Sequence, residues 1–74
     1  MKNNNSLLVE TVSILSKQML KENKNWRKGQ AVFNALHTLY PDIADSIRTT
    51  KYDPFHDDNI VKDLYNYLNG LIKQ

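Results

Sequence analysis

Apolar residues recur every three or four positions in three separate segments of this chain, and they nowhere alternate with polar residues over the length of a strand. In the first segment the spacings are 4, 3 and 4 residues, from Leu8 to Met19 through Val12 and Leu15. This period places the apolar side chains on one face of a helix, so we predict an all-α fold. The expected elements are three main helices, at about 6–21, 26–40 and 58–72, and one short helix at about 42–48.

The segment 25–40 is expected to organise the rest of the fold. It contains the single tryptophan, and Trp26, Phe33 and Tyr40 follow one another at intervals of seven residues. Pro41 should end this helix, because its ring disfavours helical geometry at the preceding residue and also suits the first turn of a new helix.

Helix ends can be predicted from short polar side chains. Asn25 is the predicted N-cap of the second main helix, and Asp57 or Asp58 is the predicted cap of the last one. Gly29 would cost about 1 kcal/mol relative to alanine in a helix interior. Either a neighbouring helix approaches its backbone closely or the first turn tolerates the glycine, and the sequence leaves both readings open.

Length and composition limit the class of protein. The 74 residues suffice for one helical domain, 6–74, after a polar segment, 1–5, that we expect to be disordered. The absence of cysteine excludes disulfides and thiolate metal sites. No apolar run has the length of a signal peptide or a membrane span. We therefore expect a cytoplasmic protein with no membrane partner.

Charge is distributed unevenly along the chain. Residues 1–40 carry six basic and two acidic side chains, whereas residues 41–74 carry four basic and six acidic ones. A basic half favours an acidic partner. The alternative is a solvated surface whose two halves attract each other in the folded protein.

No set of residues predicts catalysis or a cofactor. The cluster Asp53, His56, Asp57 and Asp58 lacks the alternating acids and central glycine of a calcium loop, and its aspartates suit helix capping. The serines lie at helix starts or within helices, and His37 falls on an apolar helix face. We expect no enzymatic activity, no metal and no cofactor.

Two surfaces are candidates for binding. One is a basic cluster near the turn between the first two main helices, where a nucleic-acid base could stack on Trp26. Its members are Lys17, Lys21, Lys24, Arg27 and Lys28. Against nucleic acid, Asp42 and Asp45 begin the short helix that would have to face phosphates.

The second surface is a polar and aromatic set centred on the second main helix, which either binds a partner protein or braces the 53–58 segment. Its members are Trp26, Arg27, Gln30, Asn34, His37, Arg48 and Asp53. Aromatic residues and arginine are common interface anchors. In the bracing alternative, Arg27 or Arg48 pairs with Asp53 or Asp57 and ties that segment to the bundle.

The pattern W-R-x-G-Q-x-x-F-N at 26–34, followed by I-R-x-T-x-x-D-P-F at 47–55, resembles a group of small uncharacterised proteins from bacteria and their phages. The resemblance covers residues 25–58 and implies no activity. It implies a phage or prophage setting, in which small proteins often act by binding a host protein. The resemblance also implies one linked unit, which consists of Trp26, Arg27, Gly29, Gln30, Asn34, Arg48, Asp53 and Pro54.

Together these observations favour a small, non-enzymatic protein-binding module, which we also expect to be able to form a homo-oligomer. The alternative is a nucleic-acid-binding protein that uses the Lys17–Lys28 cluster and Trp26. The identity of the partner is not encoded in any motif of the sequence.

Overall fold

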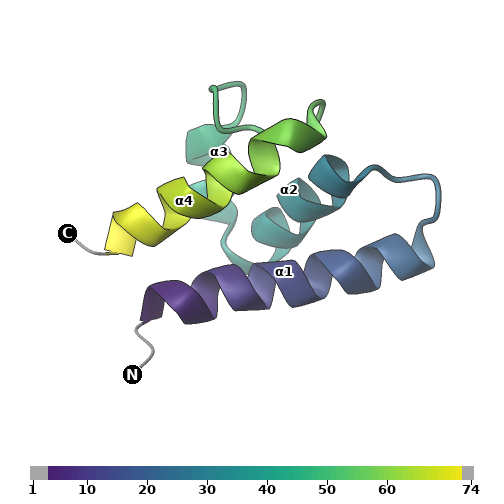
Figure 1. Ribbon diagram of the computed structural model, residues 1–74, viewed down its shortest axis with the longest axis horizontal. Coiled ribbons are helices and arrows are strands. Elements are labelled where there is room, and N and C mark those ends of the chain that lie inside the picture. The colour runs from purple at the N-terminus through teal and green to yellow at the C-terminus, as the bar shows by residue number, and fades with distance from the viewer. Residues whose placement is uncertain (1–3, 73–74) are drawn as a thin grey trace.

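The computed structural model describes residues 4–72 of the chain, with side chains described for residues 7–70. Every regular element in this part of the chain is helical and none is a strand, so the predicted all-α fold is confirmed. The elements are α1 (Asn4–Glu22), α2 (Lys28–Leu39), α3 (Pro41–Ile47), the 3-10 turn η1 (Asp58–Ile60) and α4 (Val61–Ile72) (Figure 1).

α2 is the central element of the described fold. It contacts α1, α3, η1 and α4. α1 is the longest helix, and α4 returns along it, so that the start of α1 and the end of α4 lie at the same end of the molecule (Figure 1). The segment predicted to organise the chain therefore does so by contacting every other described element.

Burial follows the helical period of the sequence. Phe33 and Leu36 of α2 are buried as expected, whereas Tyr40 is half-buried. Each large apolar side chain buried in this way contributes about 1.5–3 kcal/mol to the free energy of folding. The buried apolar residues among those described are Leu8, Val12, Ala31, Val32, Phe33, Ala35, Leu36, Ala44, Ile47, Val61, Leu64 and Leu68.

The start of α2 differs from its prediction. Arg27, in extended conformation, precedes the first helical residue, Lys28, so the predicted cap at Asn25 is wrong. The reason lies at the end of α1, where the backbone and side chain of Asn23 both donate to the carbonyl of Met19 at 2.8 and 3.0 Å. Residues 23–26 then form a turn, in which the Trp26 N–H donates to the Asn23 carbonyl, so Asn25 lies within this turn and not at the start of α2.

The other ends lie nearer their predictions. Asp57 caps as predicted, since its Oδ1 accepts from the backbone N–H of Asn59 at 2.9 Å. It caps η1, however, and α4 begins only at Val61. Part of the segment predicted as disordered, residues 4 and 5, belongs to α1, and residues 1–3 lie outside the described part. No described helix combines the length and apolarity needed to cross a membrane.

Candidate functional site

The first turn of α2 is fastened to the residues around η1. Asp58 Oδ1 accepts from the backbone N–H of Gly29 at 2.8 Å and lies 3.7 Å from Nε of Arg27. Arg27 also donates to the carbonyl of Phe55. A carboxylate at the start of a helix satisfies a free N–H group and matches the helix dipole. Asp58 therefore caps the N-terminus of α2, whose own N-cap residue, Arg27, makes no side-chain cap hydrogen bond.

Gly29 lies against the backbone of Pro54. A β-carbon at residue 29 would overlap the Pro54 carbonyl oxygen and lie 2.9 Å from Oδ1 of Asp58. Pro54 is itself fully buried. Of the two readings of Gly29 left open by the sequence, the structure selects close backbone approach, but the approaching segment is a loop and not a helix.

The 48–57 loop, which connects α3 to η1, is held by the carboxylate of Asp53. Its Oδ2 accepts from the N–H of Thr49 at 2.8 Å, and its Oδ1 accepts from the N–H of Phe55 at 3.0 Å. Thr49 has a φ of 62°, in the left-handed region that few residues other than glycine occupy. Asp53 thus fixes the loop from within, and neither Arg27 nor Arg48 pairs with it.

Arg48 makes a different set of contacts from those expected. Its guanidinium lies over the Phe33 ring, 5.4 Å from the ring centroid, and Nη2 donates to Asp45 Oδ1 at 3.2 Å. The same Asp45 oxygen lies 3.9 Å from Nε2 of His37. One exposed carboxylate of α3 therefore lies beside two side chains of the predicted set.

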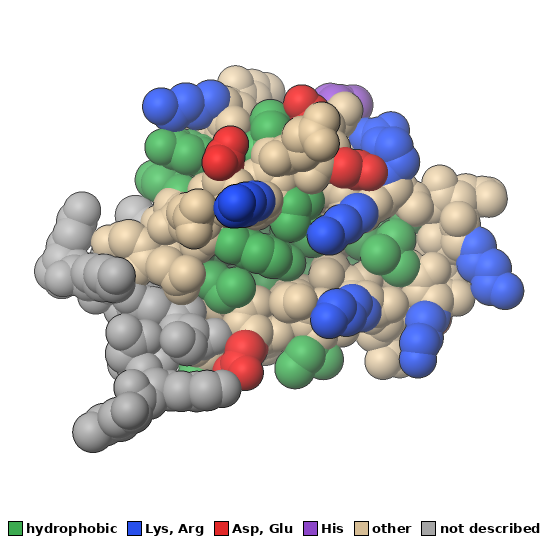
Figure 2. All heavy atoms as spheres, in the orientation of Figure 1, with side chains coloured by type: hydrophobic (Ala, Val, Ile, Leu, Met, Phe, Trp, Pro, Cys, Tyr) green, Lys and Arg blue, Asp and Glu red, His purple; other side chains and the backbone are tan. Residues whose placement is uncertain are grey.

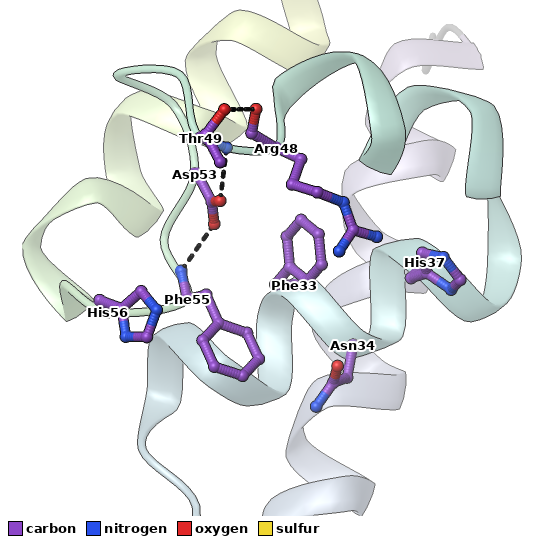
Figure 3. A pocket seen from close by; sticks show the side chains of 8 residues that line it. All are labelled: Phe33, Asn34, His37, Arg48, Thr49, Asp53, Phe55 and His56. Carbon is purple, nitrogen blue, oxygen red and sulfur yellow. Dashed lines mark hydrogen bonds between the residues drawn. The ribbon is translucent and has the colours of Figure 1, made fainter.

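These residues surround an open pocket of about 480 Å³ between α2 and the 48–57 loop (Figure 3). Its floor includes Phe33 and Phe55, whose rings meet edge to face with centroids 5.9 Å apart. The His56 ring lies 4.9 Å from the Phe55 ring. The lining residues are Phe33, Asn34, His37, Arg48, Thr49, Asp53, Phe55 and His56.

The pocket unites four members of the predicted polar set, Asn34, His37, Arg48 and Asp53. Arg27 braces the loop from outside the pocket. Trp26 is half-buried in the turn before α2, and Gln30 is half-buried on α2; neither lines the pocket.

The predicted set did not include four of the lining residues, which are Phe33, Thr49, Phe55 and His56. Phe55 could be noticed in the sequence as an aromatic residue in a loop. That observation predicts packing onto the core and does not predict a place on a pocket wall. His56 and Thr49 carried no signal of their own, because their place depends on the path of the loop between Ile47 and Asp58.

The basic cluster forms a separate surface. All five of its side chains are exposed, and Figure 2 shows Lys and Arg side chains scattered over the face that includes the α1–α2 turn. Lys28 also lines a shallow hollow together with Lys62, Tyr65 and Asp58. The carboxylate of Asp58 therefore lies beside two basic residues of the cluster, Lys28 and Arg27.

Among the described residues no three His, Asp or Glu side chains are grouped so that they could hold a metal ion. Within the Asp53–Asp58 cluster, Asp53, Asp57 and Asp58 each accept from backbone N–H groups. The roles observed for these carboxylates are loop closure and helix capping.

Comparison with protein-family models, curated proteins and solved structures gave no match.

Proposed function

We propose that this chain is a small, non-enzymatic, cytoplasmic module of bacterial or phage/prophage type that acts by binding another protein. The observation that carries the proposal is the pocket between α2 and the 48–57 loop, with its aromatic floor and polar rim (Figure 3). Arginine and aromatic side chains set in a hollow are the groups that most often anchor protein interfaces.

The contacts that brace the pocket support the same function. Asp53 closes the loop from within, and Arg27 and Asp58 fasten it to the start of α2. A surface that is ordered before binding loses less conformational entropy when the partner arrives. Bracing and binding are therefore two uses of one arrangement.

Affinity capture with a matched pair of variants tests this function. Asn34→Arg places a long side chain on the pocket rim, whereas Thr38→Arg adds the same charge on an exposed position of the same helix outside the pocket. We expect a partner protein that is captured by the wild type and by Thr38→Arg and is lost with Asn34→Arg. Equal capture by all three proteins would contradict binding through the pocket.

We also propose that the protein forms a homo-oligomer, in which copies of the chain contact each other through α1. Leu7 and Ile14 are 55% and 68% exposed, and Ile14 lines an apolar hollow with Leu15 and Leu39. Sedimentation equilibrium of the wild type and of Ile14→Lys measures this. A mass that rises with concentration only in the wild type supports the dimer, and a monomer throughout refutes it.

Nucleic-acid binding is the second candidate, favoured by the exposed Lys and Arg side chains around the α1–α2 turn (Figure 2). Phosphate contacts weaken steeply as salt rises. Gel shifts at low and moderate salt should show binding that Lys17→Glu and Lys21→Glu remove, while Lys51→Glu, on the distant loop, leaves it unchanged. Binding that survives both cluster substitutions would eliminate this candidate.

A further inference from the structure

We propose that the pocket between α2 and the 48–57 loop recognises a segment of the partner protein in which a single aspartate or glutamate stands next to an aromatic or aliphatic residue. This inference rests on the protein-binding function proposed above and specifies the chemistry of the partner. It arises from the juxtaposition of Arg48, His37 and the rings of Phe33 and Phe55.

Arg48 is oriented to receive a carboxylate. The Phe33 ring supports its guanidinium, and Figure 3 shows the group pointing toward the space between Phe33 and His37. A guanidinium has five N–H donors in a planar fork that matches a carboxylate. Among the described residues its hydrogen-bond partner is Asp45 alone, so most of the fork remains for a ligand.

Asp45 does not itself line the pocket, but it shows that Arg48 can bind a carboxylate from the side of α3. One of its oxygens is 3.2 Å from Nη2 of Arg48 and 3.9 Å from Nε2 of His37. Its side chain is 63% exposed, and exposed ion pairs of this kind hold their partners weakly. Asp45 therefore competes with the partner's carboxylate for the same two groups.

The apolar floor explains why the carboxylate should have an apolar neighbour. Phe33 is only 5% exposed, so of the two rings it is the half-buried Phe55 that still presents apolar surface to water. An aromatic or aliphatic side chain placed against Phe55 removes that surface from water while the adjacent carboxylate reaches Arg48. Both requirements can be met by two neighbouring residues of one extended segment.

A protein segment fits this pocket better than a nucleic acid. Asp42, Asp45, Asp53 and Asp57 all lie on α3 or the loop, and residues 41–74 carry an excess of acidic side chains. A chain of phosphates would be repelled by these carboxylates. A single carboxylate does not extend far enough to meet all of them.

Two blocked dipeptides test the proposal by ¹⁵N NMR titration of the full chain. N-acetyl-Phe-Glu-amide and N-acetyl-Phe-Gln-amide differ only in charge at the second side chain. We expect the Glu peptide to bind about tenfold more tightly, because its bonds to Arg48 are charge-assisted. The amide signals that shift should be those of residues around Phe33, Asn34, Arg48 and Phe55.

Variants at the rim separate the roles of the residues. Asp45→Asn should tighten Glu-peptide binding about threefold by removing the competitor, whereas Asp42→Asn, the matched change on the same helix, should have little effect. Arg48→Gln should abolish the preference for Glu over Gln, and Arg48→Lys should retain part of it because the charge remains without the planar fork. Thermal melting of each variant confirms that it is folded.

The outcomes are distinguishable from those of the capture experiment. Equal affinity for the two peptides, shifts remote from the pocket, or weaker binding by Asp45→Asn would overturn the carboxylate inference. If capture still depends on Asn34 in that case, protein binding stands without this specificity. Displacement of the peptide by a single-stranded oligonucleotide that shifts the same pocket signals would also overturn it.

Discussion

The α-carbon of Gly29 lies directly against the carbonyl oxygen of Pro54, with no room between them for a β-carbon. This contact joins the first turn of α2 to the loop that forms the far wall of the pocket. Glycine at residue 29 allows the two segments to lie this close together, because a larger side chain there would have to displace the loop backbone.

Gly29→Ala should therefore lower the free energy of unfolding by about 2 kcal/mol, the cost of forcing backbone apart in a packed region. Helix propensity alone predicts the opposite sign. Urea denaturation followed by circular dichroism measures the change. Gly70→Ala is the control: nothing lies within 4 Å of its β-carbon position, so it should raise stability by about 0.5 kcal/mol. A stabilising Gly29→Ala would contradict the contact.

Asp58→Ala should cost about 1 kcal/mol of stability, because the N–H of Gly29 loses its acceptor and α2 loses its cap. Asp58→Asn keeps an acceptor oxygen and should cost less than half as much. The ion pair with Arg27 adds little, since both side chains are about half exposed. If the two substitutions cost the same, charge and not hydrogen bonding is the main contribution of Asp58.

Thr49→Asn should raise stability by about 0.5 kcal/mol, because asparagine tolerates the left-handed conformation better than a β-branched residue. Thr49→Val keeps the branch and should bring no gain. Thermal melting of the three proteins compares them. A gain for valine equal to that for asparagine would place the effect in the side chain's surroundings and not in the backbone.

Phe33→Ala should cost about 3–5 kcal/mol, which approaches the whole stability of a domain of this size. Phe33 is buried, and its ring supports both Phe55 and Arg48. Phe33→Leu retains most of the volume and should cost under about 1.5 kcal/mol. Urea denaturation gives both values, and a folded, undiminished Phe33→Ala protein would be incompatible with this core.

Stability should fall as the pH rises above 10. Burial raises the pKa of the Tyr65 phenol above its ordinary value of 10.0, and hydrogen bonds with the Ser13 and Ser16 side chains oppose part of this rise. In that range the unfolded tyrosine loses its proton first, so deprotonation favours unfolding. Relative to the Tyr65→Phe variant, the wild type should keep a constant stability around neutral pH and lose stability above pH 10. A difference independent of pH would show that Tyr65 ionises equally in both states.

The fold was largely predictable from the sequence, whereas the site was predictable only in part. Helical period alone identifies Leu8, Val12, Phe33 and Leu36 as residues of buried faces, and a short acidic side chain identifies Asp57 as a cap. These features depend on residues within a few positions of one another. The wrong prediction of a cap at Asn25 also concerns a local feature, because a bond from the Asn23 side chain to the Met19 carbonyl sets the turn after α1.

The sequence suggested that Arg27 ties the 53–58 segment to the bundle, but it could not identify the bonded groups, because the partners lie far apart in it. Asp58 is 29 residues from Gly29, and Phe55 is 28 residues from Arg27. Arg48 illustrates the converse case. Its partner, Asp45, is three residues away on the same helical turn, whereas the sequence suggested a more distant carboxylate in the loop.

The dependence of α2 on Asp58 has a consequence for the order of events during protein synthesis. The central helix emerges from the ribosome well before its cap and before Val61, Leu64 and Leu68, the α4 residues that complete the core. Until those residues have been made, the nascent polypeptide exposes the apolar surface of α1 and α2. The domain should therefore acquire its fold only after η1 and α4 have left the ribosome.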